Sequence, residues 1–393
     1  MRKTQHLIVG VGMTADAACK GIRDFDPDGS ITVVAEEAHA PYSRPPLSKS
    51  LWKGEKESAI WRGTEDLGVE VRLGRTIVAL DLEARQATDD RGETYSYGRL
   101  LLATGGRPRR LPFGGDDVIY FRTLDDYRRL RALADEAERF LVIGGGFIGS
   151  EIAAALAMNA RSVTMVFPDP GIGARIFPAD LSASVTDYYR ERGVEVLAGT
   201  SVTAIERDGD TVLVGTGDGR TLETGAVVAG LGIEPRVELA AGAGLPVADG
   251  IVVDDRGRVE GNEDVFAAGD VARFPDRALG GTRRVEHEDH AQSHGRVVGA
   301  NMAGADKPYD HLPFFYSDLF DLGYEAVGEL DNRLETISEV SQPGDEGTVY
   351  YVDGEGRPRG VLLWNMFGRV DAASDLIRAG EPVEPGTLLE RVG

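Results

Sequence analysis

The sequence predicts an α/β protein with two doubly wound domains and a smaller C-terminal α+β domain. Three observations indicate this architecture. The chain has 393 residues, which is too long for one ordinary core and suits two or three domains. A strand, a glycine turn and a helix follow one another twice, at residues 7–15 and again at 141–149. From about Leu312 the composition changes to short, aromatic-rich strands.

The two glycine turns lie in matching surroundings. The first, LIVGVGMTA (7–15), is followed after a helical segment by the apolar run ITVVA (31–35), and the second, LVIGGGFIG (141–149), by VTMVF (163–167). Strand–helix–strand units of this kind build doubly wound parallel sheets. We therefore expect one Rossmann-type domain over 1–115 and 247–311, and another over 116–246.

The region after the second unit ends in a different kind of domain. DVFAAGDVARF (264–274) is typical of a buried strand that ends at a glycine and an acid, and a long helix is expected over roughly 286–303. The strands PFFYSDLF, GYEAVGEL, TVYYVD and GVLLWNMF and the helix DAASDLIRA follow. They predict an α+β domain over 312–393.

Charge and apolar content exclude several function classes. The chain has 43 Lys and Arg against 65 Asp and Glu, a net charge of −22, which repels nucleic acid and anionic membranes. No apolar run approaches the roughly 20 residues that a membrane span needs. The start, MRKTQHLIVGVG, leads into a glycine turn instead of a signal peptide. A cytoplasmic location is expected, and the sequence leaves monomer and homodimer open.

The chain contains one cysteine, Cys19. A single thiol forbids an internal disulfide and a dithiol redox centre, so the disulfide-reductase type of flavoenzyme is excluded. Cys19 lies in ADAACKGI, whose small residues favour helix packing, and we expect a buried structural thiol.

Gly10, Gly12 and Ala15 form G-x-G-x-x-A directly after a strand. In this motif the first glycine allows the tight turn, the second lets a pyrophosphate approach the backbone, and the small third residue lets helix and strand pack closely. The next strand ends at Glu36 and Glu37, where a carboxylate can accept from ribose hydroxyls; a solvated turn is the alternative.

Gly144, Gly146 and Gly149 form the full G-x-G-x-x-G, to which the same reasoning applies. The next strand ends in VFPDP without an immediate acid. Asp169 is placed to reach a ribose hydroxyl, whereas Arg175 is placed to meet a 2′-phosphate. NADH is the expected donor, with NADPH left open.

Two nucleotide sites in one chain imply two cofactors that exchange electrons. The glycine turns, PYSRPPLSKSLWKG (41–54), LLATGG, GGGFIGSE and VFAAGD follow the motif order of the pyridine-nucleotide-dependent FAD oxidoreductases. RPPLSK narrows this resemblance to the ferredoxin-reductase-like group, which includes putidaredoxin reductase and the biphenyl dioxygenase ferredoxin reductases. VFPD, RRVEHEDHA, NMAGADKPY and FFYSDLFDLGYEAVG are similar to apoptosis-inducing factor.

The resemblance implies FAD in the first Rossmann-type domain and NADH in the second. Lys49 would lie near the flavin N5 edge and pair with Glu151, whose alternative is a helix-dipole acid. Arg44 would line the flavin, and Asp270 would accept from a ribityl hydroxyl at a helix N-terminus. Phe147 would cover the flavin face in the nicotinamide site, or else be a core aromatic.

The resemblance places further residues at the cofactors: Thr104, Gly105, Gly269, Glu286, His287 and Tyr316. Two departures limit it. Ferredoxin reductases of this group usually have tryptophan where this chain has Glu288, and apoptosis-inducing factor has tryptophan where this chain has Tyr316, a ring still able to stack on the nicotinamide. For His290, which RRVEHEDHA also contains, a surface position is the alternative to a site role, and no metal site is expected.

The implied reaction is hydride transfer from NADH to FAD, followed by electron transfer to a ferredoxin or rubredoxin. Two alternatives stay open. One is a redox-gated interaction protein like apoptosis-inducing factor, with a long-lived complex of reduced flavin and NAD⁺. The other is a reductase for a quinone or another small molecule.

Overall fold

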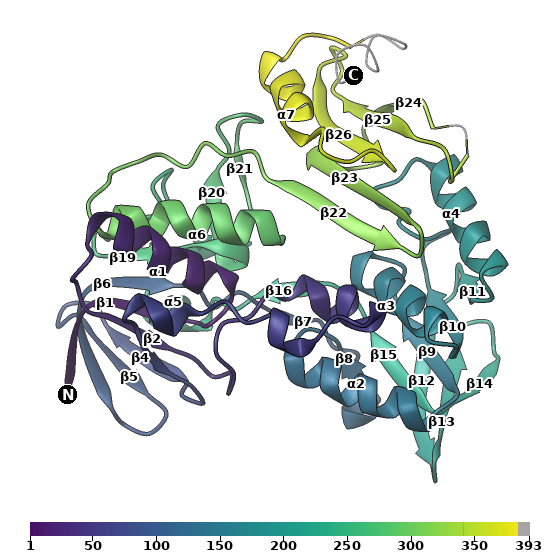
Figure 1. Cartoon of the computed structure of the whole chain (residues 1–393), viewed down its shortest axis with the longest axis horizontal. Helices are drawn as coiled ribbons and strands as arrows, with labels where there is room; N and C mark the ends of the chain where they lie inside the picture. Colours follow the sequence, from purple (N-terminus) through teal and green to yellow (C-terminus); the bar gives the residue numbers. More distant parts are fainter. Residues whose placement is uncertain (341, 384–393) are drawn as a thin grey trace. The chain divides into compact units, whose positions relative to one another are not determined.

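The computed structural model describes residues 1–340 and 342–383 and divides into two compact units (Figure 1). Unit 1 contains Met1–Arg44, Lys56–Arg107 and Glu234–Pro313, and unit 2 contains the rest of the described chain. The predicted three-domain boundaries, after residues 115, 246 and 311, stay a prediction. Segment 45–55, which carries RPPLSK from its second residue onward, groups with unit 2 although its neighbours in sequence belong to unit 1.

Unit 1 is built on a sheet whose central strand is β1 (Arg2–Val9). It pairs in parallel with β2 (Ile31–Val34) and with β6 (Thr94–Leu102), and β19 (Val265–Ala267) pairs in parallel with β6. The apolar residues of these strands are buried on both faces, as expected for a covered parallel sheet. The other strands of this sheet are β3 (Glu70–Arg72), β4 (Ile77–Asp81) and β5 (Gln86–Asp89).

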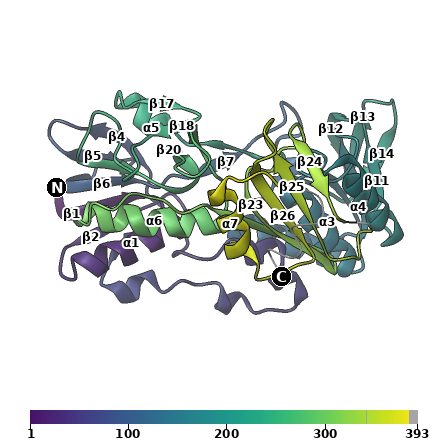
Figure 2. The same cartoon turned by 90° about the horizontal axis from the view of Figure 1, so that it is seen from above.

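Two helices of unit 1, α1 (Met13–Phe25) and α6 (Glu288–Met302), lie side by side on this sheet (Figures 1 and 2). Glycines allow the close approach, since a Cβ at Gly21 would lie 2.1 Å from the Arg296 carbonyl oxygen and one at Gly299 2.1 Å from that of Ala18. Cys19 is buried in this interface, and burial raises its thiol pKa to about 12. The prediction of a structural thiol is confirmed.

Shorter elements complete unit 1. They are the 3-10 helices η3 (Glu57–Ala59), η4 (Thr64–Leu67) and η6 (Gly269–Val271), helix α5 (Glu238–Gly242), and the strands β17 (Val247–Ala248), β18 (Gly250–Val252), β20 (Ala272–Pro275) and β21 (Thr282–Arg283). Strands β7 (Gly106–Pro108) and β16 (Ile233–Pro235) contain the points where the chain passes from one unit to the other.

Unit 2 repeats the same plan around β9 (Arg139–Ile143). Its parallel sheet has the order β11-β10-β9-β15-β8. The remaining strands of that sheet are β8 (Val118–Tyr120), β10 (Ser162–Phe167), β11 (Glu195–Ala198) and β15 (Ala226–Ala229), and the helices of this region are α2 (Leu124–Glu136), α3 (Phe147–Met158) and α4 (Ala179–Glu191). An antiparallel meander, β12 (Val202–Asp208), β13 (Thr211–Thr216) and β14 (Thr221–Thr224), and the 3-10 helices η1 (Pro45–Ser48), η2 (Ser50–Lys53) and η5 (Gly115–Asp117) complete it.

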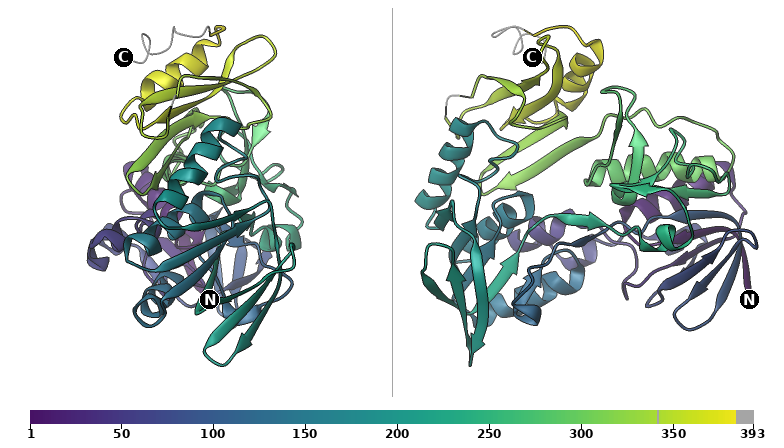
Figure 3. Two further views of the ribbon diagram at one scale, coloured as in Figure 1. Left: turned by 90° about the vertical axis from the view of Figure 1, so that its right-hand side faces the viewer. Right: turned by 180° about the vertical axis from the view of Figure 1, so that it is seen from behind.

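The C-terminal part of unit 2 is an antiparallel sheet with one helix (Figure 3). Its strands are β22 (Phe314–Leu319), β23 (Leu322–Gly328), β24 (Glu335–Ser338), β25 (Gly347–Val352) and β26 (Pro358–Trp364), and its helix is α7 (Val370–Ala379). The sheet has the order β22-β23-β26-β25-β24, with α7 packed against β23 and β26. The predicted fold class, two Rossmann-type sheets with a C-terminal α+β part, is confirmed. Over the described residues, the helices lack the combination of length and apolarity that crossing a bilayer requires.

Candidate functional site

The first glycine turn connects β1 to α1 in unit 1. Gly10 has a φ of +122°, and a Cβ there would lie 2.1 Å from the Ala103 carbonyl oxygen, so only glycine fits. Gly12, by contrast, has open surroundings, because no heavy atom of the described chain lies within 4 Å of a Cβ built there. Ala15, in the first turn of α1, is fully buried in the core of unit 1. The turn is thus closed at its first position, open at its second and packed at its third.

The second glycine turn, between β9 and α3 in unit 2, has the same geometry. Gly144 has a φ of +112°, and its Cβ would lie 2.3 Å from the Gly230 carbonyl oxygen. A Cβ at Gly149 would meet the Gly144 carbonyl oxygen at 2.0 Å, which requires the third glycine of the motif. Gly146 is open: a Cβ there would meet no described atom within 4 Å.

Both helices that follow these turns begin without a capping side chain among the described residues. Helix α2 shows the ordinary alternative. There Thr123 Oγ1 accepts from the Asp126 N–H at 3.2 Å, and the Asp126 carboxylate accepts from the Thr123 N–H at 2.7 Å. The uncapped starts of α1 and α3 leave the helix N–H groups and the positive end of the dipole available to a phosphate.

The two acids after β2 have different partners. Glu37 forms an ion pair with Arg44 and accepts from the Tyr42 hydroxyl at 2.7 Å. Glu36, whose side chain is 58% exposed, pairs with Arg236 at 2.6 Å. Glu37 therefore holds Arg44 in place, whereas Glu36 stays on the surface side of the turn, where it is accessible to a ribose.

Arg44 also interacts electrostatically with Asp270, another residue that was predicted to contact the flavin. Burial is the largest single influence and acts to lower the Arg44 pKa, but the charge and hydrogen bond of Glu37 together with the charges of Tyr42 and Asp270 raise the pKa above its usual value. Asp270 lies in the first turn of the 3-10 helix η6, next to Gly269, whose φ is +73°. The structure thus brings Arg44 and Asp270 together in unit 1.

The LLATGG segment and the residues before α6 contain the remaining residues that were predicted to contact the flavin. Thr104 Oγ1 donates to the Arg236 carbonyl oxygen at 2.8 Å, and the Arg236 N–H donates to the Gly105 carbonyl oxygen at 2.9 Å. Glu286 forms an ion pair with Arg284 at 2.5 Å, and His287 is the N-cap residue of α6. These contacts order the backbone, and the predicted cofactor roles stay predictions.

Lys49 and Glu151 form a buried ion pair in unit 2. Lys49 Nζ lies 2.6 Å from Glu151 Oε1, and the two side chains are 13% and 3% exposed. Glu151 follows Gly149 and Ser150 in the first turn and a half of α3, while Lys49 lies between η1 and η2. The expected contact is present. A helix-dipole role for Glu151 does not account for a lysine brought to it from another segment.

The two predicted aromatic residues lie near this pair. Lys49 Nζ is 5.3 Å from the centroid of the Tyr316 ring, within cation–π range. Phe147, the first residue of α3, is 38% exposed, and its ring centroid lies 6.1 Å from that of Tyr324. The core-aromatic alternative for Phe147 was wrong, because Phe147 lies at the exposed start of α3 and not in the core.

Asp169 and Arg175 contact each other. Arg175 Nε lies 3.4 Å from Asp169 Oδ1, with the arginine 81% exposed and the aspartate 33% exposed. The backbone of this loop is anchored, since the Gly199 N–H donates to the Asp169 carbonyl oxygen at 3.0 Å. Asp169 and Arg175, which were predicted to favour NADH and NADPH respectively, therefore form one ion pair.

Sequence reasoning missed several polar residues of these surroundings. Ser48 and Ser317 both donate to Glu151; Ser48 lies inside the RPPLSK motif, whereas no sequence pattern marks Ser317. Asp16 in α1 is fully buried. Burial acts to raise its pKa, but hydrogen bonds from Lys20, Arg62 and Thr64 outweigh burial and lower it below the usual value.

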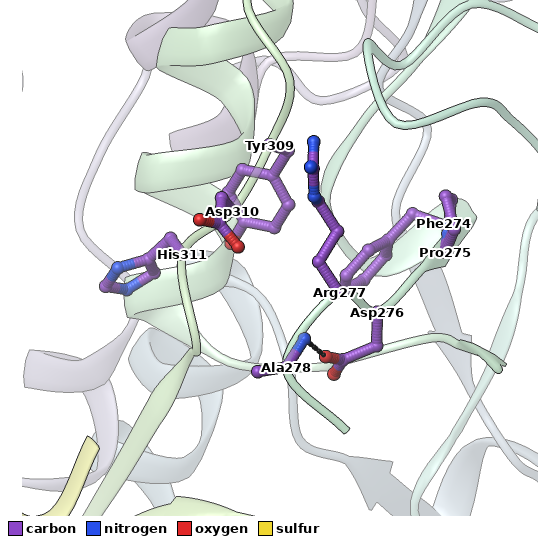
Figure 4. Close-up of a pocket in the computed structure, with 8 residues that line it drawn as sticks. All are labelled: Phe274, Pro275, Asp276, Arg277, Ala278, Tyr309, Asp310 and His311. Atoms are coloured by element: carbon purple, nitrogen blue, oxygen red, sulfur yellow. Dashed lines mark hydrogen bonds between the residues drawn. The ribbon is translucent and has the colours of Figure 1, made fainter. Parts of the chain in front are cut away.

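The surface alternative for His290 was wrong. His290 and His294 are both fully buried on one face of α6, where an i, i+4 spacing signals a shared face. His290 Nδ1 contacts the Tyr309 hydroxyl at 3.0 Å, and His294 Nδ1 accepts from the Gly269 N–H at 3.3 Å. Tyr309 also lines a small pocket, where the Arg277 side chain extends beside its ring (Figure 4). None of the predicted site residues lines that pocket.

These histidines predict a loss of stability in acid. Burial lowers the pKa of His294 to about 3 and, aided by His294, that of His290 well below its usual value. Unfolded histidine titrates near pH 6.5, so the folded state binds fewer protons below that pH, and the free energy of unfolding falls as the pH falls. Each residue contributes about 1.4 kcal/mol per pH unit between about pH 5.5 and 4.5.

Urea unfolding followed by circular dichroism at pH 5.5, 5.0 and 4.5 measures this slope. His294→Gln should reduce it by about 1.4 kcal/mol per pH unit. Between pH 7.5 and 8.5 the variant and parent should have equal slopes, which is the internal control. An unchanged slope in acid would show that His294 titrates normally in the folded protein.

Taken by unit, the residues fit two dinucleotides. Unit 1 offers an open Gly12, an uncapped α1 and the Arg44–Asp270 charges, and unit 2 offers an open Gly146 and an uncapped α3. Each set combines free backbone N–H groups, which can bind a pyrophosphate, with a nearby acid, which can accept hydrogen bonds from a ribose.

Comparison with known proteins places the chain in a family. A family model described as "Pyridine nucleotide-disulphide oxidoreductase" matches residues 4–295, and one described as "Apoptosis-inducing factor, mitochondrion-associated, C-term" matches residues 298–349. The ferredoxin–NAD(+) reductase component of the anthranilate 1,2-dioxygenase system of Burkholderia cepacia is 33% identical, covering 99% of this chain and 98% of that protein. Apoptosis-inducing factor 1 of Dictyostelium discoideum is 32% identical, with coverages of 97% and 79%. Monodehydroascorbate reductase 3 of Arabidopsis thaliana is 35% identical, with coverages of 91% and 89%.

Solved structures show the same likeness. Putidaredoxin reductase, in its covalent complex with putidaredoxin, superposes with a TM-score of 0.91 at 30% identity and covers 99% of this chain and 96% of its own. The ferredoxin reductase for the CYP199A2 system of Rhodopseudomonas palustris superposes with a TM-score of 0.90 at 32% identity, with coverages of 98% and 97%.

Proposed function

Because the chain belongs to the pyridine nucleotide-disulphide oxidoreductase family, we propose that it delivers electrons from NADH to a ferredoxin or a rubredoxin. The protein is an NAD(P)H-dependent flavoprotein oxidoreductase that uses FAD. The family description mentions disulphides, but the chain has a single, buried cysteine, so its electrons leave by another route. The observation that carries the proposal is the buried Lys49–Glu151 pair.

We assign FAD to unit 1 and the nicotinamide nucleotide to the second glycine turn in unit 2. Gly10, Gly12 and Ala15 would hold the FAD pyrophosphate at the start of α1, and Glu36 its ribose. The other unit 1 residues of this assignment are Arg44, Thr104, Gly105, Gly269, Asp270, Glu286 and His287. Gly144, Gly146 and Gly149 would hold the nicotinamide nucleotide, with Asp169 or Arg175 at its ribose. Purified protein should be yellow, and mass spectrometry of the released cofactor should show FAD; FMN in its place would overturn the assignment.

The flavin, when bound, supplies the acceptor for the nicotinamide hydride. The chain supplies charge and exclusion of water. Lys49 presents a positive charge that favours negative charge developing nearby, and Glu151 makes the buried ammonium tolerable. The Tyr316 ring beside Lys49 and the Phe147 ring at the start of α3 present flat apolar surfaces suited to a nicotinamide. Hydride transfer needs no side-chain base or nucleophile.

Donor choice depends on the Asp169–Arg175 pair. Asp169 can accept from a free 2′-hydroxyl and repels a 2′-phosphate, whereas the exposed Arg175 offsets that repulsion weakly. A difference of about 1–3 kcal/mol predicts a 5- to 150-fold preference for NADH in kcat/KM. Arg175→Ala should increase the preference and Asp169→Asn should decrease it. A clear preference of the parent for NADPH would refute the role of Asp169.

The acceptor can be identified by direct assay. NADH oxidation by the holoprotein is measured with a [2Fe–2S] ferredoxin, a rubredoxin, a soluble quinone and monodehydroascorbate, with ferricyanide as a general acceptor. Similarity to ferredoxin reductases over nearly the whole of this chain supports the first two. Turnover with ferricyanide and a small molecule alone would refute the electron-transfer proposal. We also propose a cytoplasmic location, to be tested by cell fractionation.

The match of residues 298–349 to the apoptosis-inducing-factor model favours a second candidate. In it the protein is a redox-gated interaction protein, and oxidised nicotinamide leaves slowly from between Tyr316 and Phe147. Anaerobic addition of NADH would then produce a long-wavelength absorbance band that decays slowly in air. Rapid reoxidation without this band would favour the electron-transfer reductase.

A further inference from the structure

We propose that Ser317 is a positioning residue of the Lys49–Glu151 pair, acting with Ser48 to aim the Glu151 carboxylate at the lysine. The proposal rests on the function proposed above, because it concerns the step in which NADH reduces the flavin. It assigns a role in that step to the C-terminal sheet, since Ser317 belongs to β22.

Three hydrogen-bond donors from two segments of the chain converge on Glu151. Lys49 Nζ and Ser317 Oγ both lie 2.6 Å from Oε1, and Ser48 Oγ lies 2.5 Å from Oε2. The carboxylate is thus held at both oxygens. A partial rotation about its last bond would weaken the Ser48 and Ser317 contacts together, so the two hydroxyls fix the orientation of the carboxylate plane relative to Lys49.

Charge explains why these hydroxyls matter. Glu151 is almost fully buried, and a buried carboxylate stays ionised only with a counter-charge and hydrogen bonds. Lys49 is the cation, and Tyr189 and Tyr324 are the other titratable groups whose pKa is affected. Burial first, and the Glu151 charge second, raise both tyrosine pKa values well above 10. The Tyr189 hydroxyl donates to the Ser150 carbonyl oxygen at 3.0 Å, so it does not replace Ser317.

Strand β22 contacts both members of the Lys49–Glu151 pair. Tyr316 and Ser317 are successive residues of β22, which is an edge strand of its sheet. Tyr316 presents its ring to Lys49, and Ser317, which is 1% exposed, donates to Glu151. Ser317 also lies opposite Tyr324 in the register between β22 and β23, which fixes its place along the strand.

The test compares Ser317→Ala with Ser317→Thr in the holoprotein. Loss of the hydroxyl should lower the limiting rate of anaerobic flavin reduction by NADH about tenfold, with the apparent Kd for NADH changed less than about twofold. The pH profile of this rate should also change, because the carboxylate loses one of its hydrogen bonds. The flavin midpoint potential should shift as well. Threonine, which keeps the hydroxyl, should restore all three.

Thr224→Val is the matched control, because Thr224 is a buried hydroxyl of unit 2 whose Oγ1 donates to the Arg139 carbonyl oxygen at 2.9 Å. Both variants should lose stability, but only Ser317→Ala should change the rate, pH profile and potential. Equal stability losses without those changes would overturn the proposal. If Ser317→Ala does not fold, Ser48→Ala removes the donor to Oε2 and must show the same change in pH profile.

The reductive reaction uses no acceptor protein. An effect of Ser317 on flavin reduction therefore stands even if ferredoxin and rubredoxin fail as acceptors. Conversely, a parent protein that NADH does not reduce would refute the proposed function itself and the role of Ser317 with it.

Discussion

Replacing Glu151 with glutamine should slow flavin reduction by NADH about 100-fold while FAD stays bound. Glutamine keeps the size of the side chain but removes the charge that balances Lys49, whose side chain is 13% exposed. A buried cation without its partner is costly, so Lys49 must lose its proton, move or draw water inward, and each change removes positive charge from its present position. Stopped-flow absorbance under anaerobic conditions measures the rate.

A second ion pair, between segment 45–55 and β22, serves as the control. Lys53 Nζ lies 3.4 Å from Asp318 Oδ2, but these side chains are 44% and 42% exposed. Exposed pairs contribute about 0–1 kcal/mol, so Asp318→Asn should change the rate less than about fivefold. Equal effects of the two substitutions, or normal reduction of the Glu151 variant, would show that the buried pair is only structural.

Alanine at Gly12 should lower FAD affinity without unfolding the protein. The backbone there has an ordinary φ of −75°, and a built Cβ meets no described atom within 4 Å. The methyl group instead occupies the space through which a pyrophosphate would reach the start of α1. Loss of one hydrogen bond to a charged group costs about 1.5–3 kcal/mol, or roughly 10- to 150-fold in affinity. Cofactor released into ultrafiltrate measures it.

Gly146→Ala should separate the two nucleotides. It places a methyl group at the equivalent open position of unit 2, so FAD should stay bound while KM for NADH rises by a similar factor. Gly242→Ala is the control, because Gly242 at the end of α5 has equally open surroundings outside both turns. If Gly146→Ala released FAD and Gly12→Ala retained it, the assignment of the two units would be reversed.

The elements of the fold that local sequence dictates were predicted well. Each glycine turn has its strand before it and its helix after it, because a left-handed residue at Gly10 and at Gly144 leaves few alternatives for the chain. Cys19 was correctly predicted as buried because its small neighbours require close helix packing. The contact between Lys49 and Glu151 depends on tertiary folding and was available only through family resemblance.

What the sequence did not predict depends on long-range packing. Ser317 is an unremarkable strand residue until β22 brings it to Glu151, 166 positions away along the chain. The burial of His290 was missed because it depends on contacts with Phe274 and Tyr309, which lie outside its own helix. The grouping of 45–55 with unit 2 also has no local signal.

The division of each unit into three chain segments has a consequence during synthesis on the ribosome. Strand β6 cannot pair with its neighbour β19 until residue 267 has been synthesised. The apolar side of α1 cannot pack against α6 until that helix, which ends at Met302, is complete. Unit 2 likewise needs β22 and the strands after it. A nascent chain therefore exposes unpaired strand edge and apolar helix surface until translation is nearly complete, which makes this protein a natural client for chaperones that bind growing chains.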